Sequence, residues 1–240
     1  MASLFDILRV SLLVSVSATL LLLPVSMLLA WLLARGRGWW RRPLEVAVTL
    51  PLVLPPTVTG FILLMLLGRN GFIGGLLAPL GIEITFTAGA AIAACFVVAL
   101  PLAVRPLAVA MGQVDEQLEQ AARTLGAGEW RVFWEITMPL SLRGLLAGQL
   151  LAFARSLGEF GATIIVAGNI PGITQTLPLG VYTAVTTGRD QTAFVLALVA
   201  VVLAMALVGL LALVEQRLVT DIGRGGEGSG ERTETTVLPL

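Results

Sequence analysis

Residues 118–140, LEQAARTLGAGEWRVFWEITMPL, form a polar and amphipathic stretch between long apolar segments. Glu119, Glu129 and Glu135 lie within this stretch and Glu116 lies just upstream, so four of the fifteen acidic residues gather here. Charged side chains are costly inside a lipid bilayer. We therefore expect the stretch to lie outside the membrane, where another molecule can contact it.

The composition is typical of an integral membrane protein. Apolar residues make up 57% of the 240 residues, charged residues only 12%, and the mean hydropathy is +0.93. An ordinary soluble domain carries about 25% charged residues. A multi-pass protein surrounded by membrane lipid is therefore expected, and the zero net charge gives no basis for nucleic acid binding.

The residue types that are missing exclude several chemistries. The chain has no His, its basic residues are all Arg, and its single cysteine, Cys95, lies in an apolar run. A P-loop needs a Lys for the nucleotide phosphates. Zinc sites of His and Cys, and Ser-His-Asp or Cys-His catalysis, need a His. We expect no catalytic residue, no metal site and no cofactor in this chain.

Apolar runs of about 20 residues predict membrane-spanning helices. The sequence predicts an all-α membrane protein with five spans, at residues 7–33, 44–67, 86–111, 140–157 and 192–214. Residues 161–191 are rich in Gly, Pro and Thr, which predicts a bend, an outer loop and a short helix near 179–186. Residues 1–220 are expected to form one transmembrane domain. The Gly-, Glu- and Thr-rich tail, 221–240, is expected to be disordered and cytoplasmic.

The arginines predict the orientation of these spans. Three arginines fall on the outer side of this layout and Arg155 lies within a span. The other eleven lie in inner segments or at inner ends of spans: Arg35, Arg37, Arg41, Arg42, Arg105, Arg123, Arg131, Arg143, Arg217, Arg224 and Arg232. Positive charge is enriched on the cytoplasmic side, so the N-terminus is expected outside and the C-terminus inside.

The polar stretch predicts two short helices joined by an elbow. Its first half places Leu118, Ala121, Ala122 and Leu125 at i, i+3, i+4 and i+7, and this apolar face is expected to pack against the bundle. Gly126 is expected to break the helix. On its own, the pattern also fits an inert helix at the membrane surface.

The second half continues after Gly128. Arg131 and Glu135 have the i, i+4 spacing of an ion pair. Pro139 is expected to end the segment before the next span. An apolar face is predicted to carry Trp130, Phe133, Trp134 and Thr137.

This segment resembles the cytoplasmic loop of ABC-importer permeases, whose pattern is Glu-Ala-Ala, three residues, Gly, nine residues, Ile-x-Leu-Pro. The chain has Gln120-Ala121-Ala122, Gly126 and Ile136–Pro139 at the same spacing, but Gln120 replaces the usual Glu and Met138 the usual Leu. The resemblance implies a type I ABC-importer permease fold, and a partner subunit that binds and hydrolyses ATP. It implies that loop 115–139 docks on that subunit through Glu119, Gln120, Ala121, Ala122, Gly126, Gly128, Trp130, Arg131 and Pro139.

A second resemblance concerns the substrate. QAARTLGAG (120–128), FARSLGEFGATI (153–164), GNIPG (168–172) and TQTLPLGVYT (174–183) are similar to molybdate permeases, as are LPLVLPP (50–56) and GRNGFIG (68–74). Sulfate permeases share GEFG and AGNIPG, but the run Thr174–Pro178 favours molybdate or tungstate. The resemblance implies a bacterial inner membrane homodimer with two ATPase subunits and an external oxyanion-binding protein. A sulfate or thiosulfate permease remains the alternative.

The expected pathway or gate residues cluster near the outer ends of the spans. Neutral hydroxyl, amide and backbone N–H donors suit an oxyanion that must also be released. The candidates are Pro55, Pro56, Gly158, Glu159, Gly161, Thr163, Asn169, Pro171, Gly172, Thr174, Thr176 and Pro178. The glycines and prolines also fit a purely structural role in shaping turns, and the proline pair fits a packing kink.

Glu159 is expected to form a structural ion pair with Arg155, because either charge alone would be costly in the membrane. A latch for a gate is the alternative role. An integral-membrane enzyme would need a second facing carboxylate or a base, which the spans lack, and an ATP-independent channel would not need the segment 119–139.

Overall fold

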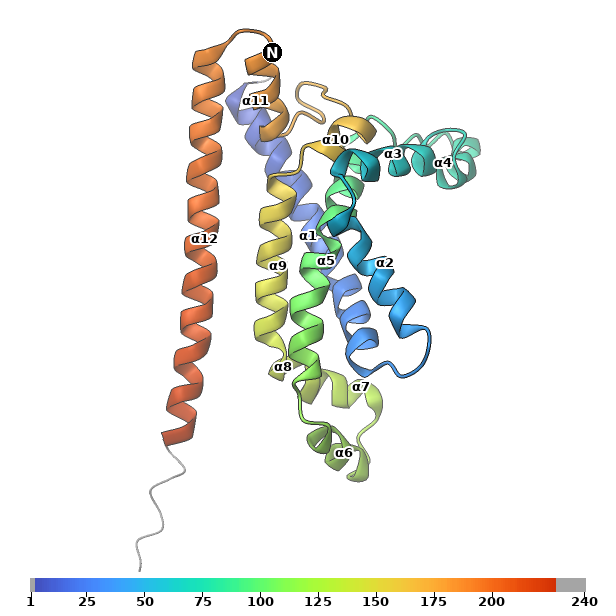
Figure 1. Ribbon diagram of the computed structural model, residues 1–240, viewed down its shortest axis with the longest axis vertical. Helices are drawn as coiled ribbons and strands as arrows, with labels where there is room; N and C mark the ends of the chain where they lie inside the picture. The colour runs from blue at the N-terminus through green and yellow to red at the C-terminus, as the bar shows by residue number, and fades with distance from the viewer. Residues whose placement is uncertain (1–2, 228–240) are drawn as a thin grey trace, which may run out of the picture.

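The computed structural model describes residues 3–227, and within this range the chain forms helices and turns with no strand (Figure 1). One helix, η1, has 3-10 geometry and one, η2, is a π-helix. The elements are α1 (Leu4–Arg35), α2 (Arg41–Val53), α3 (Pro56–Leu67), α4 (Phe72–Leu77), η1 (Ala78–Leu80), α5 (Ala88–Gly112), α6 (Glu116–Thr124), α7 (Glu129–Val132), η2 (Phe133–Thr137), α8 (Met138–Leu140), α9 (Leu142–Leu157), α10 (Gly161–Val166), α11 (Leu177–Thr186) and α12 (Asp190–Glu227).

The lengths and compositions of these helices confirm a multi-pass membrane fold. In the described range, four segments are long and apolar enough to cross a bilayer: Leu4–Arg35, Pro56–Leu80, Ala88–Gly112 and Asp190–Leu210. The helices on either side of Ser141 form a pair bent by 71°, which brings the number to five if the pair is one span.

Helices α1, α5 and α9 form the centre of the bundle and pack closely against one another. Small residues allow this close approach between helices in a membrane. A Cβ on Gly148 of α9 would lie 2.6 Å from the carbonyl oxygen of Ala103 of α5. Five alanines of α5 face the bundle and are fully buried: Ala90, Ala91, Ala94, Ala99 and Ala103.

The predicted second span, 44–67, is not one helix. Leu54 is extended, with φ −67° and ψ 139°, and separates α2 from α3. Pro55 and Pro56 lack the N–H groups that would continue the helical hydrogen bonds, and the residue before a proline avoids helical geometry. The chain therefore turns, and α3 and α4 extend sideways from the upper end of the bundle (Figure 1).

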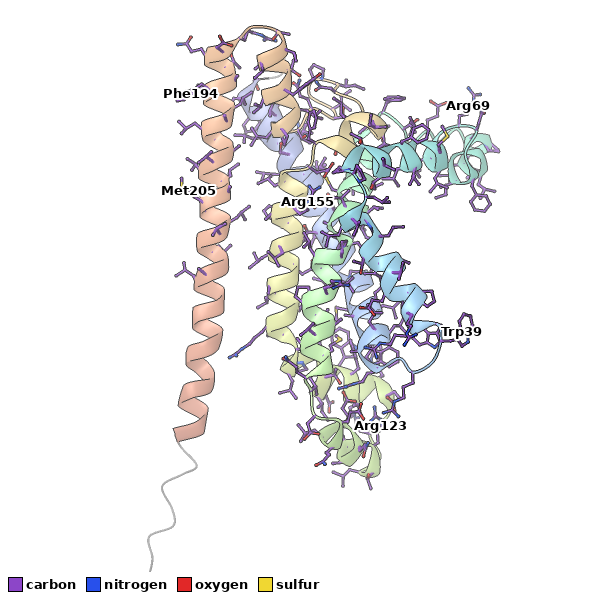
Figure 2. The ribbon with its side chains drawn as sticks, viewed as in Figure 1. Trp39, Arg69, Arg123, Arg155, Phe194 and Met205 are labelled. Atoms are coloured by element: carbon purple, nitrogen blue, oxygen red, sulfur yellow. The ribbon has the colours of Figure 1, made fainter. Side chains whose placement is uncertain are left out.

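Helix α12 runs alongside the bundle and contacts α9 and α11. Phe194 and Met205 project from it away from the other helices (Figure 2). Residues 221–227 belong to the end of α12 and residues 228–240 lie outside the described residues, so a disordered tail stays a prediction.

The two ends of the bundle carry different parts of the chain. Helices α6 and α7 lie at the lower end of Figure 1, near the turn that carries Trp39, while α10, α11 and the α3–α4 arm lie at the opposite end. Arg123 lies at the lower end and Arg155 lies near the top of α9 (Figure 2). The polar loop and the expected pathway residues are therefore separated by the length of the bundle.

Candidate functional site

Helix α6 of the polar loop packs against the bundle with its charged side, and the apolar side that was predicted to pack there faces outward. Glu119 is only 3% exposed, whereas Leu118 is 51% and Leu125 is 89% exposed. The prediction that the apolar face packs against the bundle was therefore wrong. A carboxylate can be buried when it is paired and hydrogen-bonded, and the leucines are left on the surface of the loop.

Arg35, the last residue of α1, neutralises Glu119. Its Nη2 lies 2.7 Å and its Nε 3.2 Å from Glu119 Oε1, and Nη2 also donates to the carbonyl oxygen of Val114 at 3.1 Å. Thr137 of η2 donates its hydroxyl to the same Oε1 at 2.7 Å. One carboxylate thus joins α1, α6 and η2. Neither Arg35 nor Thr137 was predicted as a partner of Glu119, because they lie 84 and 18 residues from it.

Arg123 extends this network across the elbow. Its Nη2 lies 3.4 Å from Glu119 Oε2, and its Nε lies 2.6 Å from Glu129 Oε1. The hydrogen bond from Arg123 lowers the pKa of Glu129 below its ordinary value, with a smaller contribution from the charge of Arg123. The chain Arg35–Glu119–Arg123–Glu129 therefore runs from α1 through α6 to α7.

Gly126 forms the predicted elbow between α6 and α7. Its φ of +87° is left-handed, a region that favours glycine. The N–H of Ala127 donates to the carbonyl oxygen of Ala122 at 3.0 Å, which closes the end of α6. Gly128 precedes α7 as its extended N-terminal cap. Gln120 and Ala121 are exposed on α6.

The second half of the loop carries three aromatic rings. Trp134 makes edge contacts with Trp130 and Phe133, with ring centroids 5.6 and 5.3 Å apart. Arg131 Nε lies 3.6 Å from Glu135 Oε1, the pair expected from their spacing. Pro139 lies within α8 and does not end the segment, since the 71° bend comes at Ser141.

At the outer end of the bundle, the α3–α4 arm meets α10. A Cβ on Gly161 would lie 3.0 Å from Cβ of Pro56, and one on Gly60 would lie 2.7 Å from Cα of Ala162. Pro55 is the cap before α3. The structure therefore brings the proline pair and Gly161 together, although they lie far apart in the chain. The close approach at Gly60 was missed because a glycine in an apolar run carries no distinctive signal.

Glu159 is 1% exposed and lies at the corner between α9 and α10. Arg155 Nη1 is 2.7 Å from its Oε2, and the N–H of Ala162 donates to its Oε1 at 2.7 Å. Both oxygens are therefore directed to partners within the chain. Gly158 ends α9 beside this corner.

The loop between α10 and α11 is held by its own side chains. Asn169 Nδ2 donates to Thr183 Oγ1 at 2.7 Å, and Gln175 Nε2 donates to Asn169 Oδ1 at 3.0 Å. Thr174 Oγ1 accepts the N–H of Ile170 at 2.9 Å. Asn169 and Thr174 thus fix the shape of the loop in this conformation. Gln175 and Thr183 were not predicted; Gln175 lies next to Thr174, whereas Thr183 lies inside α11.

The remaining candidates have different environments. Thr163 is fully buried in α10, whereas Pro171 and Gly172 are exposed. Thr176 Oγ1 is buried without a hydrogen-bond partner in the described part of the chain. Pro178 and Gly158 line a largely apolar cavity of about 680 Å³ between α9, α11 and α12. The candidates therefore form separate groups at one end of the bundle and no single pocket.

Within residues 3–227 no group of three His, Cys, Asp or Glu side chains could hold a metal ion.

Comparison with protein families gives one match that covers most of the chain. Residues 23–220 match the model described as "Binding-protein-dependent transport system inner membrane component". The chain belongs to this family. It is therefore a non-catalytic, membrane-spanning subunit of a transport system in the inner membrane.

Curated members of this family are similar over nearly the whole chain. The "Molybdenum transport system permease protein ModB" of Haemophilus influenzae is 45% identical over 90% of this chain and 96% of its own length. The protein of the same name from Escherichia coli K12 is 49% identical over 81% and 86%. The "Sulfate transport system permease protein CysW" of Synechocystis is 40% identical over 78% and 68%.

Solved structures of transporters share the fold of this inner membrane component. A bacterial ABC transporter involved in the import of alginate has a TM-score of 0.72 at 16% identity, covering 89% of this chain and 79% of that chain. An amino acid ABC transporter has a TM-score of 0.62 at 17% identity, covering 89% and 92%. These similarities confirm the predicted permease fold.

Proposed function

We propose that this chain is the permease subunit of an ATP-driven importer of molybdate, with tungstate as a second substrate of the same type. The support comes from the ModB relatives, which are 45% and 49% identical over most of both chains. The resemblance of Thr174–Pro178 to molybdate permeases agrees with this assignment.

A sulfate or thiosulfate permease is the alternative function. The CysW relative is 40% identical, but the match covers only 68% of its length. The lower identity and the shorter match favour molybdate. Both proposals concern tetrahedral dianions, so neutral donors at the outer end of the bundle suit either one.

The observation that carries the ATP-driven assignment is the exposed apolar face of α6. Leu118 and Leu125 are held on the surface because Glu119 occupies the buried side of the helix. An amphipathic helix that presents its apolar side outward can dock in a groove of another protein. We assign this face, with Gln120, Ala121 and the elbow at Gly126, to the contact with the ATPase subunit.

The complete transporter in this proposal has two copies of the chain, two ATPase subunits and an external oxyanion-binding protein. The pathway lies between the two copies, near the outer ends of α2, α9 and α10. Pro55, Pro56 and Gly161 are the residues most suited to border it, because they lie at breaks in the helices and are not buried. Asn169 and Thr174 shape the neighbouring loop.

The test is the ATPase activity of the complex reconstituted in proteoliposomes with its binding protein. Binding protein loaded with molybdate or tungstate should stimulate ATP hydrolysis, and the sulfate-loaded protein should not. Stimulation by sulfate alone would support the sulfate permease. ATP hydrolysis that no loaded binding protein changes would contradict an importer of these oxyanions.

A further inference from the structure

Helix α1 makes polar contacts with both ends of the bundle. At its inner end Arg35 binds Glu119 of the polar loop, with Nη2 2.7 Å from Oε1. Near its outer end Ser11 Oγ accepts the N–H of Leu177, the first residue of α11, at 2.7 Å. Twenty-four residues of helix separate Ser11 and Arg35, which is about 36 Å at 1.5 Å per residue.

Both contacts are buried and hydrogen-bonded. Glu119 is 3% exposed and Ser11 is 1% exposed. Between them, Gln149 Nε2 of α9 donates to Ser26 Oγ of α1 at 2.9 Å, in the middle of the bundle. Because buried polar groups are costly to separate from their partners, these contacts tie α1 to the loop, to α9 and to α11.

Glu119 is also too buried to serve as a contact for a separate protein. Its Oε1 accepts from Arg35 and Thr137, and its Oε2 faces Arg123. Glu116, one turn earlier on the same helix, is half exposed. Its Oε2 lies 3.3 Å from Arg37 Nη2, and its Oε1 lies 3.9 Å from Arg35 Nη1, a longer contact than that of Glu119. The two glutamates of α6 therefore have different tasks, although a charge pattern does not distinguish them.

We propose that Glu119 is a positioning residue that fastens the polar loop to α1, and that α1 carries the movement of this loop to the start of α11 through Ser11. This inference rests on the proposed function, in which the loop contacts the ATPase subunit. Helix α11 follows the loop 167–176, so movement of α1 would reach the segment that carries Thr174 and Thr176.

The experiment compares variants of the whole transporter, reconstituted in proteoliposomes with its ATPase subunits and molybdate-loaded binding protein. Glu119→Gln removes the charge that binds Arg35 and keeps the size of the side chain. Its matched control is Glu45→Gln in α2, an exposed glutamate that pairs with Arg105 at 3.7 Å. Ser11→Ala removes the acceptor for the N–H of Leu177, and Ser15→Ala, another buried serine of α1, is the matched control.

Two quantities are measured: radiolabelled molybdate transported per ATP hydrolysed, and the amount of ATPase subunit that copurifies. We expect Glu119→Gln and Ser11→Ala to lower transport per ATP by about tenfold, within the range of ordinary coupling between sites. The copurified ATPase subunit should stay at the level of the unmodified complex. Both controls should keep the normal ratio.

A third variant separates positioning from stability. Arg35→Gln combined with Glu119→Gln removes both buried charges, so no unpaired charge remains. We expect this double variant to regain thermal stability relative to Glu119→Gln but to keep the low transport per ATP. Recovery of the normal ratio together with stability would show that the pair only supports folding, and would overturn the proposal.

Other outcomes also overturn it. A normal ratio in Glu119→Gln or in Ser11→Ala would show that the contact does not transmit movement. Loss of copurified ATPase subunit in Glu119→Gln would place Glu119 in the docking contact or the folding of the loop. The unmodified complex distinguishes these failures from failure of the proposed function, because it must itself transport molybdate with ATP.

Discussion

A Cβ placed on Gly60 would lie 2.7 Å from both the Cα and the carbonyl oxygen of Ala162, so α3 and α10 meet backbone to backbone. Beside this contact, Gly161 packs against Pro56 at the start of α3. The sideways arm of α3 and α4 is thus fastened to the bundle at the point where the chain leaves α9 for the outer loop.

Gly60→Ala should therefore destabilise the protein. Any side chain forces the two backbones apart, and overpacking of this kind costs about 2 kcal/mol. The midpoint of thermal unfolding in detergent should fall. Gly75→Ala is the control, since a Cβ there lies 3.7 Å from the nearest atom, the carbonyl oxygen of Arg69. Equal midpoints for the two variants would contradict the close approach at Gly60.

Hydropathy was sufficient to predict the long helices of this fold. The runs 7–33, 86–111 and 192–214 lie within α1, α5 and α12 apart from two residues at the start of α5, because a span needs only length and apolar composition. The break at Leu54 required more than composition. Pro51 sits inside α2, whereas Pro55 and Pro56 separate two helices. A proline inside an apolar run gives the same sequence pattern whether it kinks a helix or ends it. Which of the two occurs depends on the contacts with the rest of the fold.

The polar loop shows the limit of a pattern read along one segment. The spacing of Leu118 and Leu125 correctly predicted a helical face but assigned it to the wrong side. Apolar residues are buried by default, and here the helix is reversed because Glu119 contacts Arg35, 84 residues away, and Thr137. The spacing of residues within one segment carries no information about a partner so far away in the chain. The elbow at Gly126 was predictable because its cause is local.

The ion pair of Arg155 and Glu159 predicts a specific pattern among variants. Glu159→Gln or Arg155→Met alone leaves a charged group without its partner near the buried corner of α9, which lowers the free energy of unfolding by about 3 kcal/mol. The double variant should be less destabilised than the sum of the two single variants. Unfolding midpoints and recovery after size-exclusion chromatography measure this. A double variant worse than that sum would rule out stabilisation by the pair.

The pair of Arg123 and Glu129 predicts a pH dependence of the elbow. Hydrogen bonding to Arg123 lowers the pKa of Glu129 in the folded protein below its ordinary value. The stabilisation is therefore present above about pH 4.3, the ordinary pKa of Glu in an unfolded chain, and is lost as the pH falls through the lower folded pKa. It should be small, because both side chains are exposed to solvent.

The difference in unfolding midpoint between the unmodified protein and Glu129→Gln isolates this contribution. It should be constant at neutral pH and shrink toward zero in acid. Glu135→Gln serves as the control, because Glu135 pairs with Arg131 at 3.6 Å and not with Arg123. A difference that grows as the pH falls would show that the sign of the pKa shift is wrong.

The exposed loop predicts the site of contact with the ATPase subunit. A Cβ on Gly128 has no atom within 4 Å, and its φ of −72° accepts any residue, so Gly128→Cys should fold normally. The native Cys95 is buried, which leaves the new thiol as the reactive one. A short thiol-to-amine crosslinker should join residue 128 to an ATPase subunit in the active complex. Leu80→Cys, exposed in η1 directly after α4, should give no such product. An active complex that crosslinks equally from both positions, or from neither, would remove the docking role from the loop.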